Sequence, residues 1–247
     1  MDNIGTINSD IKRLKQKERR LTMLMEMKRQ TTSKFKFKDP GSAISHLIFT
    51  IIALIATPPL LLKAYHMPGY APLLSMILFM SGVILLYSAS TIYHSFDISI
   101  EVNTKLKKID HMMIYILIAG SYSPICLIAL GNTTGLVLFI VIWVLALIGI
   151  FQALFFIHCP KWVNSTIYIA MGWSCIFSFT QLINSLSRPA FLWLLAGGII
   201  YTIGGVIYAL KLPIFNGRHK NFGSHEIFHL FCIGGTLCHY ILMYYLV

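Results

Sequence analysis

Two histidines stand four residues apart in the segment His225-Glu226-Ile227-Phe228-His229. On an α-helix such residues project from one face about one turn apart, so that their imidazole rings can share one metal ion. The segment also matches the H-E-x-x-H pattern, in which a zinc metalloprotease uses the glutamate as its general base. The spacing therefore predicts a metal site, and the rest of the chain has to decide its kind.

Other polar residues could complete such a site. A catalytic zinc ion takes three protein ligands and a water molecule, and His94 is the predicted third nitrogen donor. Ser90 lies four residues before it, on the same helix face. Asp110 follows soon afterwards and is placed to hydrogen-bond a ligand histidine or the zinc-bound water. His46 and His111 stay open as ligands or as polar core residues.

The elements that must position these residues are predicted to be membrane helices. Hydrophobic residues make up 56% of the chain, charged residues only 12%, and the mean hydropathy is +0.71. A soluble domain carries about 25% charge, and a membrane-spanning helix needs about 20 apolar residues. We expect an all-α bundle of seven transmembrane helices, residues 43–247, after a basic N-terminal segment, residues 1–42. The predicted spans are 43–65, 71–95, 110–130, 135–157, 163–184, 190–210 and 225–247.

Positive charges are distributed unevenly around these spans. Residues 1–42 hold eleven Lys or Arg, and the loops after the second, fourth and sixth spans hold seven more. The loops on the opposite side hold only Lys63 and Arg188. Because positive loops stay on the cytoplasmic side, we expect a cytoplasmic N-terminus and a C-terminus outside. The membrane topology then explains the net charge of +11, and we expect no nucleic-acid partner.

The predicted topology places the candidate site residues at one depth. His94 lies near the cytoplasmic end of the second span, Asp110 opens the third, and the histidine pair opens the seventh. Ionisable residues inside a span are costly and usually face the bundle interior, so each is a functional candidate. The sequence thus predicts a zinc site of three histidines in the inner leaflet, with Asp110 and Ser90 beside it.

The protease interpretation is less favoured. An intramembrane metalloprotease adds a distant aspartate ligand, whereas Asp110 is followed by His-Met-Met and not by glycine. Glu226 lies about 100° around the helix from His225, so it leaves the face that the histidines share. We expect Glu226 to favour the positive N-terminal end of its helix, with Ser224 as the N-cap.

Four ordered motifs also carry a family resemblance. They are Ser90-Thr-Ile-Tyr-His94, Lys108-Ile-Asp110, Ala119-Gly-Ser-Tyr-Ser-Pro124 and Ser224-His-Glu-Ile-Phe-His229, with Ser45-His46 before them. From about residue 41 to 247 the chain resembles the progestin and adipoQ receptor family, in its bacterial hemolysin III branch. The resemblance implies that His94, His225 and His229 bind Zn²⁺, that Asp110 lies beside the zinc-bound water and that Ser90 lies near the metal.

Three functions follow as expectations. The first is a zinc-dependent hydrolase of a lipid amide or ester, similar to ceramide hydrolases, that acts in membrane lipid homeostasis. The second is a pore-forming or channel-like hemolysin, and the third is a receptor-like regulator in which zinc is structural. In each case we expect a multi-pass protein of the bacterial plasma membrane with a membrane lipid as its substrate or ligand. The oligomeric state stays open.

Overall fold

The computed structural model describes residues 13–18, 21, 38–156, 159–210 and 223–247. The chain divides into two compact units, Met1–Lys36 and Phe37–Val247. In the first unit, residues 13–18 are helical. Among the residues described, the long helices all lie in the second unit, and no strand occurs.

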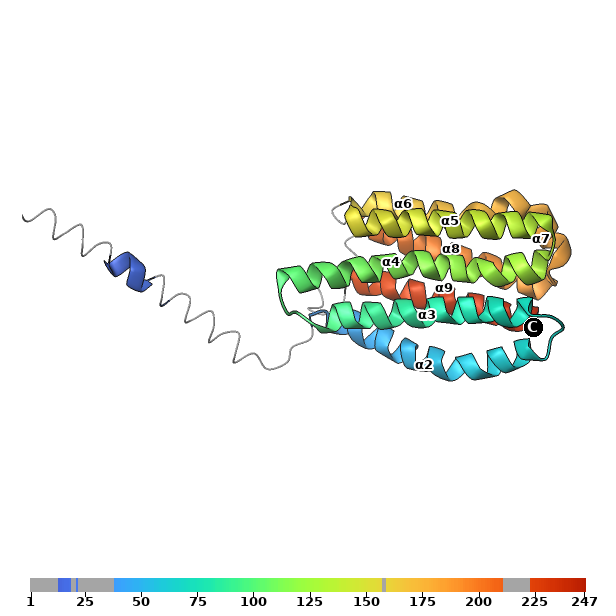
Figure 1. Ribbon diagram of the computed structural model, residues 1–247, viewed down its shortest axis with the longest axis horizontal. Coiled ribbons are helices and arrows are strands. Elements are labelled where there is room, and N and C mark those ends of the chain that lie inside the picture. Colours follow the sequence, from blue (N-terminus) through green and yellow to red (C-terminus); the bar gives the residue numbers. More distant parts are fainter. Residues whose placement is uncertain (1–12, 19–20, 22–37, 157–158, 211–222) are drawn as a thin grey trace, which may run out of the picture. The chain divides into compact units, whose positions relative to one another are not determined.

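In the described part of the second unit, seven helical segments are long and apolar enough to cross a membrane (Figure 1). The predicted all-α seven-helix bundle is therefore confirmed, and six of the seven spans were predicted to within three residues at each end. Which side of the membrane holds each terminus stays a prediction from the charges. The segments are α2 (Pro40–Tyr65), α3 (Ala71–Ser95), α4 (Ile100–Pro124) with a π-helical turn (Ile125–Leu130), α5 (Thr133–Phe155), α6 (Lys161–Gly172) with a 3₁₀ turn (Trp173–Ser178) and α7 (Phe179–Ser185), α8 (Arg188–Leu210) and α9 (Ser224–Leu246).

The third span is longer than predicted. The prediction placed residues 97–108 in a membrane-surface loop, but α4 already begins at Ile100. Local interactions make this charged stretch helical: the Ser99 hydroxyl accepts a hydrogen bond from the backbone N–H of Val102 at 3.2 Å, and Lys105 pairs with Glu101 one turn earlier. Only residues 96–99 separate α3 from α4. Asp110 consequently lies almost three turns inside its helix.

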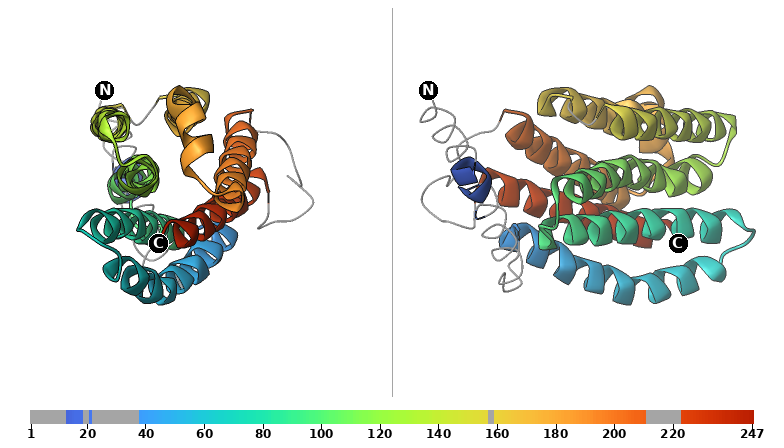
Figure 2. Two further views of the ribbon diagram at one scale, coloured as in Figure 1. Left: turned by 90° about the vertical axis from the view of Figure 1, so that its right-hand side faces the viewer. Right: turned by 60° about the vertical axis from the view of Figure 1, so that its left-hand side comes forward.

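Helices that follow one another in the chain pack side by side from α2 to α5, and α8 packs on α9. The view along the bundle shows α9 between α2 and α8, so the last helix packs against the first as well as against its predecessor (Figure 2). The last helix is therefore a neighbour of helices from both ends of the span order. This arrangement brings the start of α9 within reach of α2 and α3.

Two glycines let α3 and α4 approach closely. A Cβ atom added at Gly120 would lie 2.7 Å from the Leu78 carbonyl oxygen, and one added at Gly82 would lie 3.1 Å from the Ile116 carbonyl oxygen. In membranes, small residues at such positions allow backbones to pack against each other. The α3–α4 contact therefore depends on the absence of side chains at these two positions.

Substitution of Gly120 by alanine should destabilise the bundle. Its Cβ would push against backbone that cannot move freely, at a cost of about 1–3 kcal/mol. In Gly198→Ala the added Cβ has nothing closer than 3.9 Å, so this control should keep or raise stability because alanine favours helix by about 1 kcal/mol. Thermal unfolding of both variants in detergent measures the difference. Equal melting temperatures would contradict a tight α3–α4 contact.

The fifth span is interrupted in its middle, between α6 and α7. The hydroxyl of Tyr122 in α4 donates a hydrogen bond to the Gly172 carbonyl at 2.6 Å and accepts one from the backbone N–H of Cys175 at 2.8 Å. Irregular backbone at membrane depth is tolerated where protein groups satisfy it or where it lines a cavity. Both conditions hold here, because Gly172 and Cys175 also line the internal cavity described below.

Candidate metal centre

A buried hydroxyl network fixes α9 against its neighbours near the candidate site. The hydroxyl of Thr236 in α9 lies 2.7 Å from that of Tyr87 in α3 and 2.6 Å from that of Tyr201 in α8. Thr236 donates to the Cys232 carbonyl at 3.1 Å, so both tyrosines can donate to it. Thr236 lies two turns after His229, and the network therefore sets the position of the α9 histidines relative to α3.

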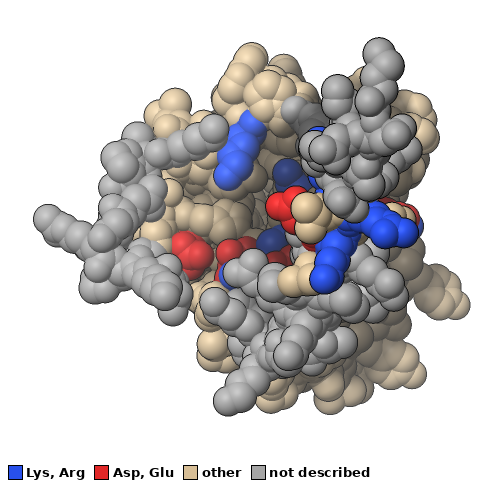
Figure 3. All heavy atoms as spheres, turned by 90° about the vertical axis from the view of Figure 1, so that its left-hand side faces the viewer, with Lys and Arg blue, Asp and Glu red and all other residues tan. Residues whose placement is uncertain are grey.

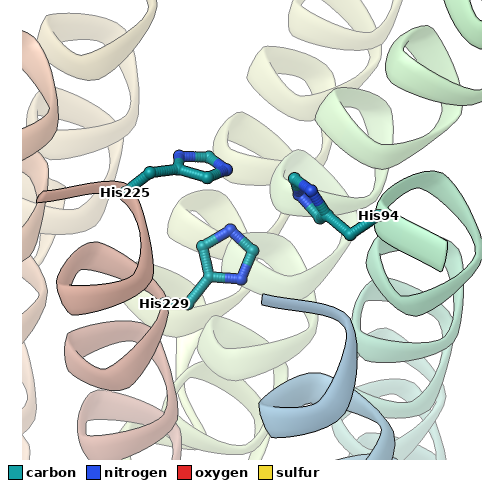
Figure 4. Close-up of side chains that lie close together, drawn as sticks. All are labelled: His94, His225 and His229. Carbon is teal, nitrogen blue, oxygen red and sulfur yellow. The ribbon is translucent and has the colours of Figure 1, made fainter. Parts of the chain in front are cut away.

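Three histidine rings meet at this end of the bundle. One nitrogen of each of His94, His225 and His229 lies within 4.8 Å of the other two. The ring centroids are 5.0 Å apart for His94 and His225, 4.8 Å for His94 and His229, and 4.6 Å for His225 and His229. Figure 4 shows His94 facing the pair from the end of α3. The structure thus brings together the three residues that the sequence placed at one depth.

The three rings fit a metal ion. Nε2 of His94 and Nδ1 of His225 and His229 are buried and have no hydrogen-bond partner among the described residues. A buried polar atom without a partner is costly, and a bound cation removes that cost. Tetrahedral ligands at zinc–nitrogen distances of 2.0–2.1 Å stand about 3.4 Å apart. Inward movement of the side chains by about 1 Å or less would complete that geometry.

The other nitrogen of His94 contacts a carboxylate. Nδ1 lies 2.9 Å from Oδ2 of Asp39, the residue before α2. This hydrogen bond from His94 lowers the pKa of Asp39 below its usual value, although partial burial opposes the shift. Asp39 is therefore ionised at neutral pH, and its oxygens act as acceptors.

Ser90 and Asp110 lie beside the histidines, on α3 and α4. Both are buried, and both line the same cavity as the three rings. The Ser90 hydroxyl lies next to the Asp110 carboxylate. Asp110 is not in the group whose ligand atoms lie within 4.8 Å of one another. It therefore lines the cavity beside the three rings without being a ligand in that group.

His46 and His111, which the sequence left open, are not part of the group either. The ring of His46 stacks on that of His229 with centroids 4.0 Å apart and touches Tyr87 edge-on. Both ring nitrogens of His46 are buried without a hydrogen-bond partner among the described residues. His111 lies on α4 and lines the cavity. His46 therefore supports the cluster as a packing neighbour.

Glu226 caps the start of α9. Its Oε2 accepts a hydrogen bond from the backbone N–H of Gly223 at 2.8 Å, and its Oε1 accepts one from the Ser42 hydroxyl at 3.4 Å. The carboxylate thus lies at the positive end of the helix, as expected. The expected N-cap was wrong, because Gly223 occupies that position and Ser224 is the first helical residue. The helix begins one residue earlier than the apolar pattern indicates.

The cluster opens into an internal cavity of about 350 Å³. The cavity reaches His239 of α9, ten residues or about 15 Å beyond His229. Its remaining wall is mostly apolar, with Leu86, Leu117, Ile118, Phe191, Leu194 and Leu195 among the lining residues. A pocket of this size with a few convergent polar groups is typical of a site for a small molecule or a lipid chain.

Lysines stand at the same end of the bundle. Lys107 and Lys161 line the cavity together with the histidines. The Nζ atom of Lys38 lies 3.7 Å from the centroid of the Tyr93 ring, and Nζ of Lys161 lies 4.3 Å from the centroid of the Tyr208 ring. Figure 3 looks onto this end of the molecule and shows lysine or arginine side chains close to acidic ones. The site therefore lies where the bundle carries its charged groups.

Sequence reasoning missed Asp39. It falls within residues 1–42, the predicted basic N-terminal segment, whereas the compact unit begins at Phe37 and α2 at Pro40. An acidic residue directly before a proline that opens a helix is a typical N-cap signal. That signal indicates a helix start but says nothing of a contact with His94, which is 55 residues away.

Together, the fold and the cluster define a seven-helix membrane protein with a candidate metal centre at one end of the bundle. The chain belongs to the Haemolysin-III related family, whose match covers residues 36–240. It is thus a multi-pass protein of the bacterial cell membrane.

Relatives agree with this membership. The chain is 34% identical over 201 residues to the Hemolysin-3 homolog of Bacillus subtilis (strain 168), which covers 81% of this chain and 89% of the relative. It is 33% identical over 218 residues to Hemolysin-3 of Bacillus cereus, which covers 87% and 93%. A more distant relative is the Adiponectin receptor protein of Drosophila melanogaster, 25% identical over 177 residues, 66% of this chain and 40% of the receptor.

Proposed function

We propose that the protein is a zinc-dependent hydrolase of a lipid amide or ester and that it acts in membrane lipid homeostasis. The observation that carries the proposal is the group of three converging histidines at the polar end of an apolar cavity, with a buried carboxylate on the wall. A purely structural metal site is usually closed by four protein ligands. The group here holds three among the described residues, which leaves room for a reacting molecule.

Zinc is the proposed metal because its ligands would all be imidazole nitrogens. Three histidines and one open position are the arrangement of catalytic zinc sites, whereas calcium and magnesium prefer oxygen ligands. When bound at such a site, zinc polarises a carbonyl group and makes water a stronger acid. His94, His225 and His229 would hold it.

The remaining roles follow from the positions of the side chains. The apolar wall between the histidines and His239 holds an acyl chain and excludes water. Asp110 accepts a proton from the attacking water and returns it to the leaving amine or alcohol, as a general base and then a general acid. The Ser90 hydroxyl beside it keeps the Asp110 carboxylate in place. The basic residues predicted to be cytoplasmic would put this chemistry at the inner leaflet.

The test uses the purified full chain in vesicles of phosphatidylethanolamine, phosphatidylglycerol and a ceramide, so that ester and amide bonds are both present. We expect about one zinc per chain, because the described residues hold one such group of three histidines. Fatty acid release, followed by mass spectrometry, should stop when a strong chelator removes the zinc and should return when zinc is added back.

The other candidate functions give different results in the same experiment. A protein with structural zinc would release no fatty acid, and its helices would melt at a lower temperature after chelation. A pore would let ions cross the vesicle membrane, and this flux would persist without hydrolysis. Less than about half a zinc per chain would exclude the metal site altogether.

A further inference from the structure

Asp39 makes two contacts with the same residue of another helix. Its carboxylate Oδ2 lies 2.9 Å from Nδ1 of His94, and its backbone N–H donates to the His94 carbonyl oxygen at 3.0 Å. Asp39 directly precedes Pro40, the first residue of α2, and His94 is the penultimate residue of α3. The start of one helix is thus tied to the ligand residue at the end of the next.

The orientation of the Asp39 side chain is unusual for its position. An aspartate at an N-cap normally accepts a hydrogen bond from the first turn of its own helix. Asp39 is the N-cap of α2 but makes no such bond. Its carboxylate turns to the imidazole of His94 instead. The Asp39 side chain is 38% exposed, whereas the His94 side chain is only 2% exposed. The Asp39 carboxylate therefore bonds His94 in place of the backbone of its own helix.

This contact decides which nitrogen of His94 faces the other two rings. A carboxylate only accepts hydrogen bonds, so Nδ1 must carry a proton, and in the neutral imidazole Nε2 then keeps its lone pair. Nε2 is the buried nitrogen of His94 without a partner among the described residues. A neutral histidine binds a metal through the nitrogen that has no proton.

We propose that Asp39 is a positioning residue of the metal centre, which holds His94 in the tautomer and ring orientation that present Nε2 to a metal ion. The inference rests on the proposed function, because it assumes that the three histidines bind metal. In proteins, loss of such an outer carboxylate lowers metal affinity by about 10–100-fold. The side chain touches neither substrate nor metal and acts only through His94.

The zinc affinity of the purified full chain tests the role, measured by competition with a chromophoric chelator in Asp39→Ala, Asp39→Asn and Asp39→Glu. We expect Asp39→Ala to bind zinc about 100-fold more weakly and Asp39→Asn about 10-fold more weakly, because the amide oxygen still accepts a hydrogen bond but carries no charge. Asp39→Glu should recover part of the affinity. Asp97→Asn is the control, since Asp97 is exposed at the same end of the bundle and accepts a hydrogen bond from Asn103.

A second measurement separates positioning from a structural role. With cobalt in place of zinc, the visible spectrum reports the geometry of the ligands. Asp39→Asn should alter this spectrum, while the melting temperature of the metal-free protein should stay unchanged. If wild type binds one metal ion and all three Asp39 variants bind it within a factor of two, the positioning role is wrong while the proposed metal site stands. If wild type binds no metal, both ideas fail.

Discussion

Substitution of His225 by alanine is expected to lower zinc affinity by more than about 100-fold, since loss of a ligand exceeds the loss of an outer partner. The side chain is one of three whose nitrogens converge within 4.8 Å. It is also the least buried of the three, so its removal disturbs packing the least. Metal content after equilibration with buffered zinc, read by mass spectrometry of the element, measures the effect.

His46→Phe is the matched control for this prediction. Its ring would keep the stacking on His229, 4.0 Å between centroids, but offers no nitrogen. Because His46 lies outside the group of three, zinc content should equal that of wild type. Zinc retained in His225→Ala, or zinc lost equally in His46→Phe with the helices intact, would mean that the site has another ligand set.

Substitution of Asp110 by asparagine is expected to slow lipid hydrolysis by about 10²–10⁴-fold, the contribution of a general acid–base residue. The amide keeps the size of the side chain and can still meet the neighbouring Ser90 hydroxyl, but it cannot accept a proton. Zinc content should stay at the wild-type level, because Asp110 is outside the ligand group. Initial rates of fatty acid release from the same vesicles provide the measurement.

Asp97→Asn controls for the loss of one carboxylate at this end of the bundle and should leave the rate unchanged. A rate in Asp110→Asn above half of the wild-type value would exclude Asp110 as the proton acceptor. Joint loss of zinc and activity would instead show that Asp110 holds the metal site together. An effect on activity alone is the result that a catalytic role requires.

The transmembrane helices could be predicted because lipid imposes a length and an apolar composition on each of them. The exception was α4, where residues 100–108 are charged and helical. The signals for that helix were present in Ser99 as an N-cap and in the spacing of Glu101 and Lys105, but apolar length does not detect them. Helix ends that capping interactions determine are therefore harder to predict from hydropathy than helix ends that the membrane thickness determines.

Part of the candidate site could also be predicted. The spacing of His225 and His229 is local, since residues four positions apart on a helix share a face. The order of the spans then placed His94 and Asp110 at the same end of the bundle. Neither argument says which helices are neighbours, and the contact of α9 with α2 and the hydroxyl network around Thr236 decide that.

The sequence by itself therefore determined the class of protein, the seven spans and the end of the bundle at which the polar residues gather, because hydrophobic length and helical period are local properties. Only the tertiary structure decided that one nitrogen of each of three rings lies within 4.8 Å of the others. The same holds for the bond of Asp39 to His94 and for which of the neighbouring histidines belong to the group. Such contacts depend on how helices far apart in the chain pack, and no spacing within the sequence encodes a distance between them.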